Sequence, residues 1–226
     1  MLRYPSSWLQ GVSLGESIAS ELRLQIISGR IKPGEIISEN RVAAEFGTSR
    51  SPVREALKSL SSEGLIRLER MGAVVVGLSL TDIVELYDVR FLIESFVQQR
   101  LAEMDREQLL TSLRRIVDRM ELAVKHQDAV EFSFQDLSFH EAIITAADHK
   151  RILHLWSSIR PIVMTVMLIT TEEIFSKGEK KLGSVIGKHL KIMDGLAFGD
   201  ADEIQKLVQE YFADSRMTLH RSLTDF

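Results

Sequence analysis

The residues from Thr48 to Gly64, TSRSPVREALKSLSSEG, constrain the fold of this chain more than any other stretch. Ser51 followed by Pro52 predicts a helix start, with Ser51 as the N-cap and Pro52 at the first helical position, where its missing N–H costs no hydrogen bond. Glu55 is the expected acidic member of a capping box with Ser51. Apolar residues then recur at helical spacing, so one face of this helix can pack against a core. They are Val53, Ala56, Leu57 and Leu60.

A second face of the same helix is cationic. Arg50, Arg54 and Lys58 follow one another at intervals of four residues, which places them in one row on the helix surface. Cations at the start of a helix, beside free backbone N–H groups and small hydroxyls, suit a helix that enters the major groove of DNA. A solvated charged helix would show the same row, so the flanking segments must decide between the two readings.

The flanking segments predict a winged helix-turn-helix. Residues 38–46, SENRVAAEF, form a short helix that Gly47 ends and turns toward the next. After Gly64, the β-rich runs LIRLE and VVVGL are joined by residues 70–73 as a hairpin. An earlier helix, from Ser13 or Gly15 to about Ser28, packs behind these elements, and residues 1–12 form an arm without periodicity.

Four motifs follow one another in this half: ISGRIKPG, SENRVA, SRSPVREAL and EGLI. In order and spacing they resemble those of the GntR family of bacterial transcription regulators, and the resemblance runs from Leu14 to Gly77. It implies binding to a double-stranded DNA operator. Asn40 stands where the family commonly has arginine, so the base preference is expected to differ from that of relatives with arginine there. The residues expected to contact DNA are Asn40, Arg41, Ser49, Arg50, Ser51, Arg54 and Gly72.

Charge divides the chain near the same place. The net charge is −4, but residues 1–79 hold 10 Lys/Arg against 8 Asp/Glu, and residues 80–226 hold 18 against 24. A surplus of two cations is small for a DNA-binding domain, so DNA binding depends on where the arginines point rather than on bulk charge. We therefore expect a winged helix-turn-helix domain at residues 1–79 and a second domain at residues 80–226.

The second domain is expected to be an all-α bundle. Its periodicity predicts six helices at about residues 81–104, 105–126, 128–147, 150–175, 180–198 and 200–223, with Pro161 kinking or interrupting the fourth. The motifs ELYDVRFLIE, DLSFHEAI and HLKIMDGLAFGD resemble the FadR-like branch of the GntR family. That resemblance implies an effector-binding FCD domain that also dimerises. The fold class is thus mainly α, with a winged helix-turn-helix followed by a helical effector-binding bundle.

Polar residues interrupt the apolar faces of four predicted helices, which is how a pocket inside a helical bundle shows itself. Asp136 and His140, four residues apart, place a carboxylate and an imidazole on adjacent turns, a spacing that suits a divalent metal. His189 on another helix is the expected third ligand. Arg90 and Tyr211 interrupt two further apolar faces and are expected to bind the effector.

The resemblance implies one Asp and three His around a divalent metal ion such as Zn, Ni or Mn. The last histidine is expected at position 211, which is Tyr211 here, and tyrosine is a poor ligand at its usual pKa of about 10. Asp214 could take its place. Two forms stay open: a three-ligand metal site completed by water or effector, and a metal-free pocket that binds an organic anion directly. The second would use Arg90, His140, His189 and Tyr211.

These features predict a ligand-responsive repressor that binds an inverted-repeat operator as a homodimer and responds to a small carboxylate effector. A metal-dependent hydrolase would need a general base or nucleophile beside the metal, which is not recognisable, and the winged head would be unexplained. A structural DNA-binding protein with a vestigial pocket is the third reading. Because the chain shows no secretory signal, no cysteine and no apolar run of about 20 residues, we expect a cytoplasmic protein without a membrane partner.

Overall fold

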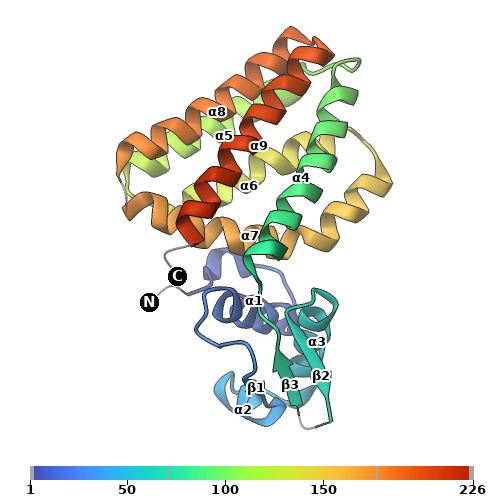
Figure 1. Cartoon of the computed structure of the whole chain (residues 1–226), viewed down its shortest axis with the longest axis vertical. Helices are drawn as coiled ribbons and strands as arrows, with labels where there is room; N and C mark the ends of the chain where they lie inside the picture. Colours follow the sequence, from blue (N-terminus) through green and yellow to red (C-terminus); the bar gives the residue numbers. More distant parts are fainter. Residues whose placement is uncertain (1–2, 71, 177, 224–226) are drawn as a thin grey trace. The chain divides into compact units, whose positions relative to one another are not determined.

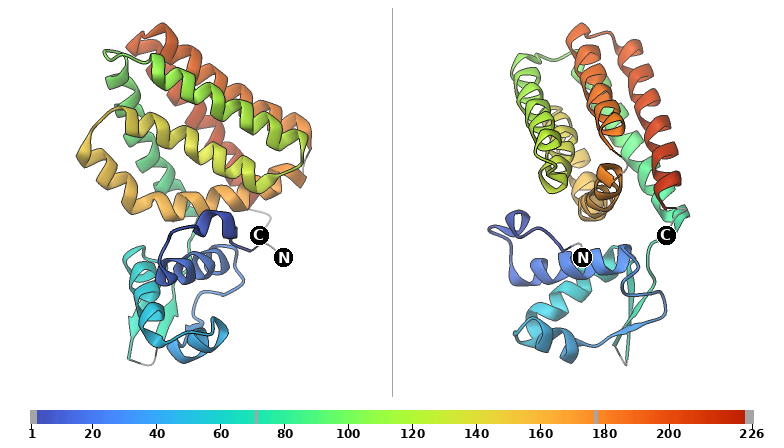
Figure 2. Two further views of the ribbon diagram at one scale, coloured as in Figure 1. Left: turned by 180° about the vertical axis from the view of Figure 1, so that it is seen from behind. Right: turned by 90° about the vertical axis from the view of Figure 1, so that its left-hand side faces the viewer.

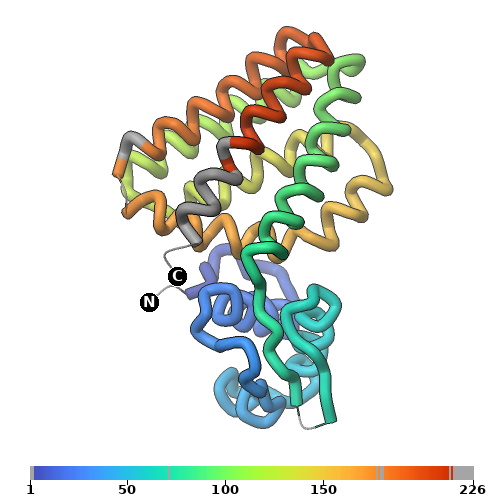
Figure 3. The backbone as a smooth tube through the Cα atoms, in the orientation of Figure 1, coloured from blue at the N-terminus to red at the C-terminus, as the bar shows by residue number. Residues whose placement is uncertain are grey.

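The computed structural model describes residues 3–70, 72–176 and 178–223, except the side chains of residues 179, 180, 214 and 216–223. The chain forms two compact units, Met1–Ser79 and Leu80–Phe226. Figure 1 labels the helices and strands of both units, and Figure 3 traces their backbone. Each unit has its own packing.

In the described part of the first unit, three α-helices pack with a small antiparallel sheet (Figure 1). The strand order is β1-β3-β2, and the β2–β3 hairpin is the predicted wing. The short strand β1 was not predicted, since two residues are too few to show a periodic pattern; its Ile36 pairs with Val74. The elements are η1 (Ser6–Leu9), α1 (Leu14–Ile27), β1 (Ile36–Ile37), α2 (Glu39–Glu45), α3 (Arg50–Ser62), β2 (Ile66–Glu69) and β3 (Gly72–Val75).

The start of α3 corrects one prediction. Ser49, not Ser51, is the N-cap, and its side chain makes no capping hydrogen bond. Glu55 lies four residues after Ser51, one too many for a capping box. Pro52 still lies in the first turn, where backbone N–H groups have no acceptor within the helix. Glu55 instead approaches α1, because a Cβ at Gly15 would lie 2.9 Å from its Oε2 atom, so glycine permits the close packing of α1 and α3.

The core of the first unit gathers apolar side chains from all three α-helices and the sheet. One buried charge accompanies them, because Arg23 on α1 is fully buried. Its Nε and one terminal nitrogen each lie 2.6 Å from a carboxylate oxygen of Glu63, at the end of α3. A buried charge needs such a partner, so the pair fixes α1 against α3. The core includes Ile18, Leu22, Ile26, Val42, Val53, Leu57, Leu60, Leu65 and Val75.

The described part of the second unit contains six helices, and every end lies within three residues of its prediction. α7 continues through Pro161 without interruption, and the hydroxyl of Thr165 donates a hydrogen bond of 2.9 Å to the Pro161 carbonyl. The helices are α4 (Leu80–Leu101), α5 (Glu107–Lys125), α6 (Ala129–Ala146), α7 (Lys150–Ser176), α8 (Glu179–Phe198) and α9 (Ala201–Leu223).

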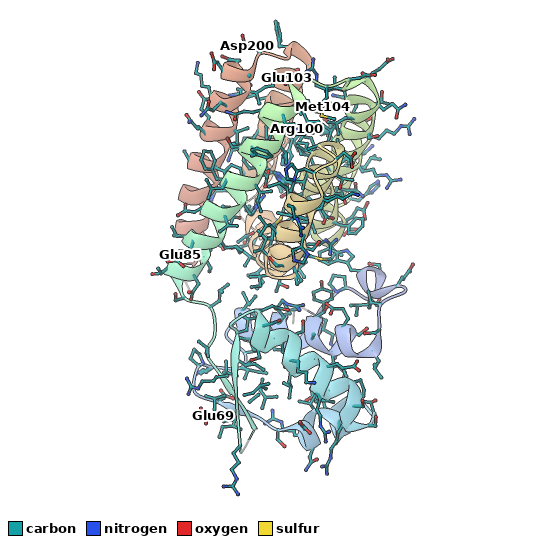
Figure 4. All side chains as sticks on the ribbon, turned by 90° about the vertical axis from the view of Figure 1, so that its right-hand side faces the viewer. Glu69, Glu85, Arg100, Glu103, Met104 and Asp200 are labelled. Carbon is teal, nitrogen blue, oxygen red and sulfur yellow. The ribbon has the colours of Figure 1, made fainter. Side chains whose placement is uncertain are left out.

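These helices form a bundle in which α4 packs on α9, α5 on α6 and α6 on α7 (Figure 2). One end of the bundle brings together the end of α4 and the turn between α8 and α9. Figure 4 labels Arg100 and Asp200 at this end. The Arg106 guanidinium lies so close to Gly199, which has φ 75°, that a Cβ there would be 2.6 Å from a terminal nitrogen. Glycine is favoured at that turn by its backbone conformation, because L side chains rarely adopt this positive φ.

Among the described residues, α7 is the one helix long and apolar enough to cross a membrane by length and composition. Half of its most apolar 18-residue window is buried. Residues 162–171 of the helix are all buried. A buried core helix passes the same test, so α7 is weak evidence for a membrane span.

Candidate nucleic-acid interface and metal centre

The turn between α2 and α3 forms as predicted. Gly47 has φ 61°, and the Thr48 amide donates a hydrogen bond of 2.9 Å to the Ala43 carbonyl. The tight turn places the start of α3 beside the start of α2, and the wing lies along the same side. A surface groove of about 400 Å³ runs between them, lined among others by Glu39, Asn40, Arg50, Arg70 and Gly72.

The residues predicted to contact DNA are on the surface of the first unit. Three of them line the groove, namely Asn40, Arg50 and Gly72. Arg54 projects from α3 with 59% of its side chain exposed, and its Nε lies 3.0 Å from a carboxylate oxygen of Glu39. The remaining three are exposed outside the groove lining: Arg41, Ser49 and Ser51. Glu39 and Arg70 also line the groove but were not predicted from the sequence. Glu39 lies at the start of the predicted short helix, and Arg70 lies in the predicted hairpin connection.

The position of Gly72 corrects a second prediction. It is the first residue of β3 rather than part of the loop, and it pairs with Glu69. Its φ is 139°, and a Cβ there would lie 2.9 Å from a methyl group of Ile36. Glycine is therefore needed because β1 approaches the wing closely at this point.

The second unit brings the three predicted metal ligands together. Asp136 and His140 lie on α6 and His189 on α8, all buried, with ligand atoms within 4.8 Å of one another. The Oδ1 atom of Asp136 is 2.8 Å from Nε2 of His189 and 3.5 Å from Nε2 of His140. An oxygen and two imidazole nitrogens at this separation form a donor set that suits a divalent transition metal.

The other nitrogen of each imidazole contacts a hydrogen-bond acceptor. Nδ1 of His140 lies 2.6 Å from Oε2 of Glu94, and Nδ1 of His189 lies 2.8 Å from the Val185 carbonyl. Because Nδ1 must donate in both contacts, the neutral form of each ring carries its lone pair on Nε2. Nε2 of each ring faces Asp136: it presents a lone pair in a neutral ring and donates to the carboxylate in a protonated one.

Glu94 is the principal residue that sequence reasoning missed. It is fully buried on α4, one turn after Arg90, and accepts hydrogen bonds of 3.1 and 3.2 Å from that guanidinium. Glu94 could have been predicted from the sequence, because it follows Arg90 by four residues on the same apolar face and ends the motif ELYDVRFLIE. Arg90 also lies over the ring of Tyr87, 4.9 Å from the centroid. The predicted effector-binding arginine is thus held by α4 itself.

Tyr211 on α9 lies where the resemblance places a fourth ligand. Its hydroxyl is 2.9 Å from Nε2 of His140. Burial and the nearby Asp136 carboxylate raise the pKa of Tyr211 well above its ordinary value, so the phenol stays protonated and can donate to that nitrogen. The side chain of Asp214, the substitute ligand, lies outside the described residues.

Charge pairing controls the protonation of this cluster. Burial would raise the pKa of Asp136, but His189 and His140 outweigh it and hold that pKa well below its ordinary value. Burial likewise opposes ionisation of Glu94, yet His140 and Arg90 lower its pKa. Burial would lower the pKa of His140, and the Glu94 carboxylate raises it instead. The carboxylates are therefore ionised at neutral pH and attract cations to this point.

A small cavity of about 60 Å³ opens beside Asp136. Its lining combines cationic, phenolic and hydroxyl groups with apolar side chains from several helices, among them Arg90, Thr171, Lys188 and Tyr211. Lys188, one residue before His189, was not predicted as a pocket residue. The cavity thus adjoins the three-ligand cluster on the side that carries Arg90 and Lys188.

A winged helix-turn-helix with exposed arginines, joined to a separate helical bundle, defines a DNA-binding transcription regulator. Residues 14–76 match the model of the bacterial regulatory proteins of the gntR family, and residues 85–214 match the FCD domain. The chain belongs to the GntR family, in its FadR-like branch with an FCD domain.

Similar proteins agree with this assignment. The chain is 45% identical over 211 residues to the gluconate operon transcriptional repressor of Bacillus subtilis (strain 168), covering 93% of this chain and 87% of that one. Its identity to the repressor of the same description from Bacillus licheniformis is 42% over 213 residues, with 94% and 88% covered. The McbR/YncC protein of E. coli shares the fold at a TM-score of 0.72 and 19% identity, with 93% and 98% covered. This chain is accordingly a transcriptional repressor of the GntR family and not an enzyme.

Proposed function

We propose that this repressor binds an inverted-repeat operator as a homodimer and is modulated by a sugar-acid effector bound beside a divalent metal ion. The observation that carries the proposal is the convergence of Asp136 Oδ1, His140 Nε2 and His189 Nε2 next to a cavity with cationic lining. The operon named for the two relatives, gluconate, supplies the effector class.

The donor set fits a metal because it gathers more acceptors than donors. With both Nδ1 atoms donating, the two Nε2 lone pairs and the Asp136 carboxylate face one another, and the Tyr211 hydroxyl offers a single proton. A bound cation would interact with the lone pairs that receive no proton. Glu94 and the Val185 carbonyl would hold the two rings in the orientation and tautomer that binding requires. A metal bound there supplies positive charge for a carboxylate ligand.

The cavity lining suits an organic acid. Arg90 and Lys188 provide positive charge and hydrogen-bond donors, and Thr171 and Tyr211 provide hydroxyls for a polyhydroxy chain. An acid that bound there would interact with groups from α4, α7, α8 and α9 at once. It would change DNA binding if it favoured one arrangement of the dimer over another.

The way in which winged helix-turn-helix domains bind DNA supports a dimer. One winged head spans a short half-site, so two heads related by a two-fold axis would read an inverted repeat. The helical unit would hold the two copies together. Such a repressor acts on chromosomal operators, which is consistent with a cytoplasmic location.

A metal-free pocket is the second candidate, and the Tyr211 contact favours it. A phenol 2.9 Å from Nε2 of His140 satisfies that nitrogen without a metal. In this form Arg90, His140, His189 and Tyr211 would bind the acid directly.

Three measurements test the proposal on the full chain. Elemental analysis of the purified protein should find about one Zn, Ni or Mn per chain, whereas none after reconstitution would favour the metal-free pocket. Gluconate should raise the melting temperature more than glucose does, since only the acid carries a carboxylate. Selection from a random duplex pool should recover an inverted repeat, and failure to enrich any motif would contradict operator binding.

A further inference from the structure

We infer that Glu39 is a positioning residue for Arg54 and thereby a determinant of DNA sequence specificity. The inference rests on the proposed binding of an operator by α3. Glu39 is the first residue of α2, and Arg54 lies on α3, fifteen residues later. Their ion pair joins the two helices of the helix-turn-helix at the surface expected to meet DNA.

The pair is too exposed to matter for stability alone. The side chain of Arg54 is 59% exposed and that of Glu39 is 36% exposed. Ion pairs with this exposure contribute little to folding, because water screens the charges and two long side chains lose freedom. The main effect of the contact is therefore to orient the guanidinium of Arg54.

The chemistry of the guanidinium makes that orientation useful. The carboxylate of Glu39 engages the Nε edge of Arg54 at 3.0 Å. The terminal nitrogens lie on the opposite side of the planar group, and their fork can donate two hydrogen bonds to O6 and N7 of guanine. A side chain already held in one orientation loses less freedom on binding.

The charge of Glu39 has a second effect. Its side chain lines the groove with Asn40 and Arg50, where DNA phosphates would approach. A carboxylate there repels the phosphate backbone of any sequence, whereas the base contact of Arg54 is made only with the correct sequence. Glu39 thus weakens binding to random DNA and favours binding to the operator. An acid in the first turn of α2 could also stabilise that helix, but this role would not change the ratio of operator affinity to random-DNA affinity.

Three variants separate these roles. Glu39→Ala removes both the acceptor and the charge, and Glu39→Gln keeps an amide oxygen that can accept from Nε. Glu45→Ala removes the same charge from the other end of α2, where the side chain is exposed. Each full-length variant is titrated against the duplex that the parent selects from a random pool and against a shuffled duplex of the same composition. Thermal melting checks that each variant folds.

We expect Glu39→Ala to bind the shuffled duplex more tightly. The ratio of affinity for the selected duplex to affinity for the shuffled duplex should fall at least ten-fold. Glu39→Gln should also bind the shuffled duplex more tightly but keep most of the base preference, and Glu45→Ala should keep the parent ratio. Reselection with Glu39→Ala should relax the same base position that Arg54→Ala relaxes. An unchanged ratio in Glu39→Ala, or equal losses in Glu39→Ala and Glu39→Gln, overturns the positioning role. A parent protein that selects no motif overturns operator binding and this inference together.

Discussion

The carboxylate of Glu94 on α4 lies 2.6 Å from Nδ1 of His140 on α6. The same carboxylate accepts two hydrogen bonds from Arg90, so one buried anion joins the cavity-lining arginine to a histidine of the proposed metal site. Both atoms of the Glu94–His140 contact are inaccessible to water, which makes the contact strong and its loss costly. The orientation of His140 therefore depends on a residue outside the ligand set.

Replacing Glu94 should weaken the metal site without removing a ligand. In Glu94→Gln the amide holds the imidazole less firmly and gives it less basicity, so we expect the metal affinity to fall about 10–100-fold. Competition with a chromogenic chelator measures the affinity. Glu121→Gln, on the exposed face of α5, is the matched control and should bind metal as the parent does. Equal affinity in Glu94→Gln and the parent would show that Glu94 does not orient the ligand.

Replacing His140 should remove the site itself. We expect His140→Ala to lose bound metal and to unfold more easily by about 1–3 kcal/mol, because Glu94 and Tyr211 lose a buried hydrogen-bond partner. Elemental analysis and thermal melting measure the two effects. His154→Ala, an exposed histidine on α7, should change neither. Metal content equal to that of the parent would exclude the three-ligand site.

Periodicity predicted the fold well because each helix of the second unit has a buried face and short connections. Both ends of all six helices were placed within three residues. The start of α3 was missed because Ser49 and Ser51 are both good N-caps in sequence, and the structure uses Ser49. The strand β1 was missed because its two residues gain their conformation from pairing with β3, a contact distant in sequence.

The candidate site was predicted only in part, because some of its contacts join residues that are distant in the sequence. A polar residue on an apolar face indicates a pocket, and this located Arg90, Asp136, His140, His189 and Tyr211, all of which are buried. The partners of these residues depend on packing between helices. The contact of Glu94 with His140 spans 46 residues and that of Glu39 with Arg54 spans 15. Helical spacing within one element cannot indicate such contacts.

Tyr211 distinguishes the two forms of the pocket. In Tyr211→His an imidazole takes the place of the phenol beside His140, so we expect tighter metal binding, by about ten-fold or more, if a metal occupies the cluster. Tyr211→Phe keeps the ring and removes the hydroxyl. It should leave the metal in place but reduce gluconate binding, measured by calorimetry. Loss of gluconate binding in both variants, with no metal in either, would support the metal-free pocket.

The metal-free protein should be most stable between about pH 4.5 and 6.5. The lowered pKa values of Asp136 and Glu94, ordinarily 3.8 and 4.5, give stability that is present above those values and lost as the pH falls through the folded-state values. The raised pKa of His140, ordinarily 6.5, gives stability that is complete below 6.5 and lost as the pH rises through its folded-state value. Melting temperatures in a chelator measure this profile. His140→Gln should lack the alkaline decline, and an identical decline in the variant would assign it to other groups.

Arg54 should be required for specific DNA binding and dispensable for folding. Its side chain is mostly exposed and its ion pair with Glu39 lies on the surface, so Arg54→Ala should melt within a few degrees of the parent. Loss of a bidentate contact with guanine costs about 1–3 kcal/mol, and a dimer would lose two such contacts, so we expect binding to the selected duplex to fall by more than ten-fold. Mobility-shift titration measures this loss. Arg115→Ala removes an exposed arginine from α5 in the helical unit and should bind as the parent does. Unchanged binding by Arg54→Ala would contradict the assignment of α3 as the helix that reads the operator, because an exposed arginine near its start would then make no contact with the bases.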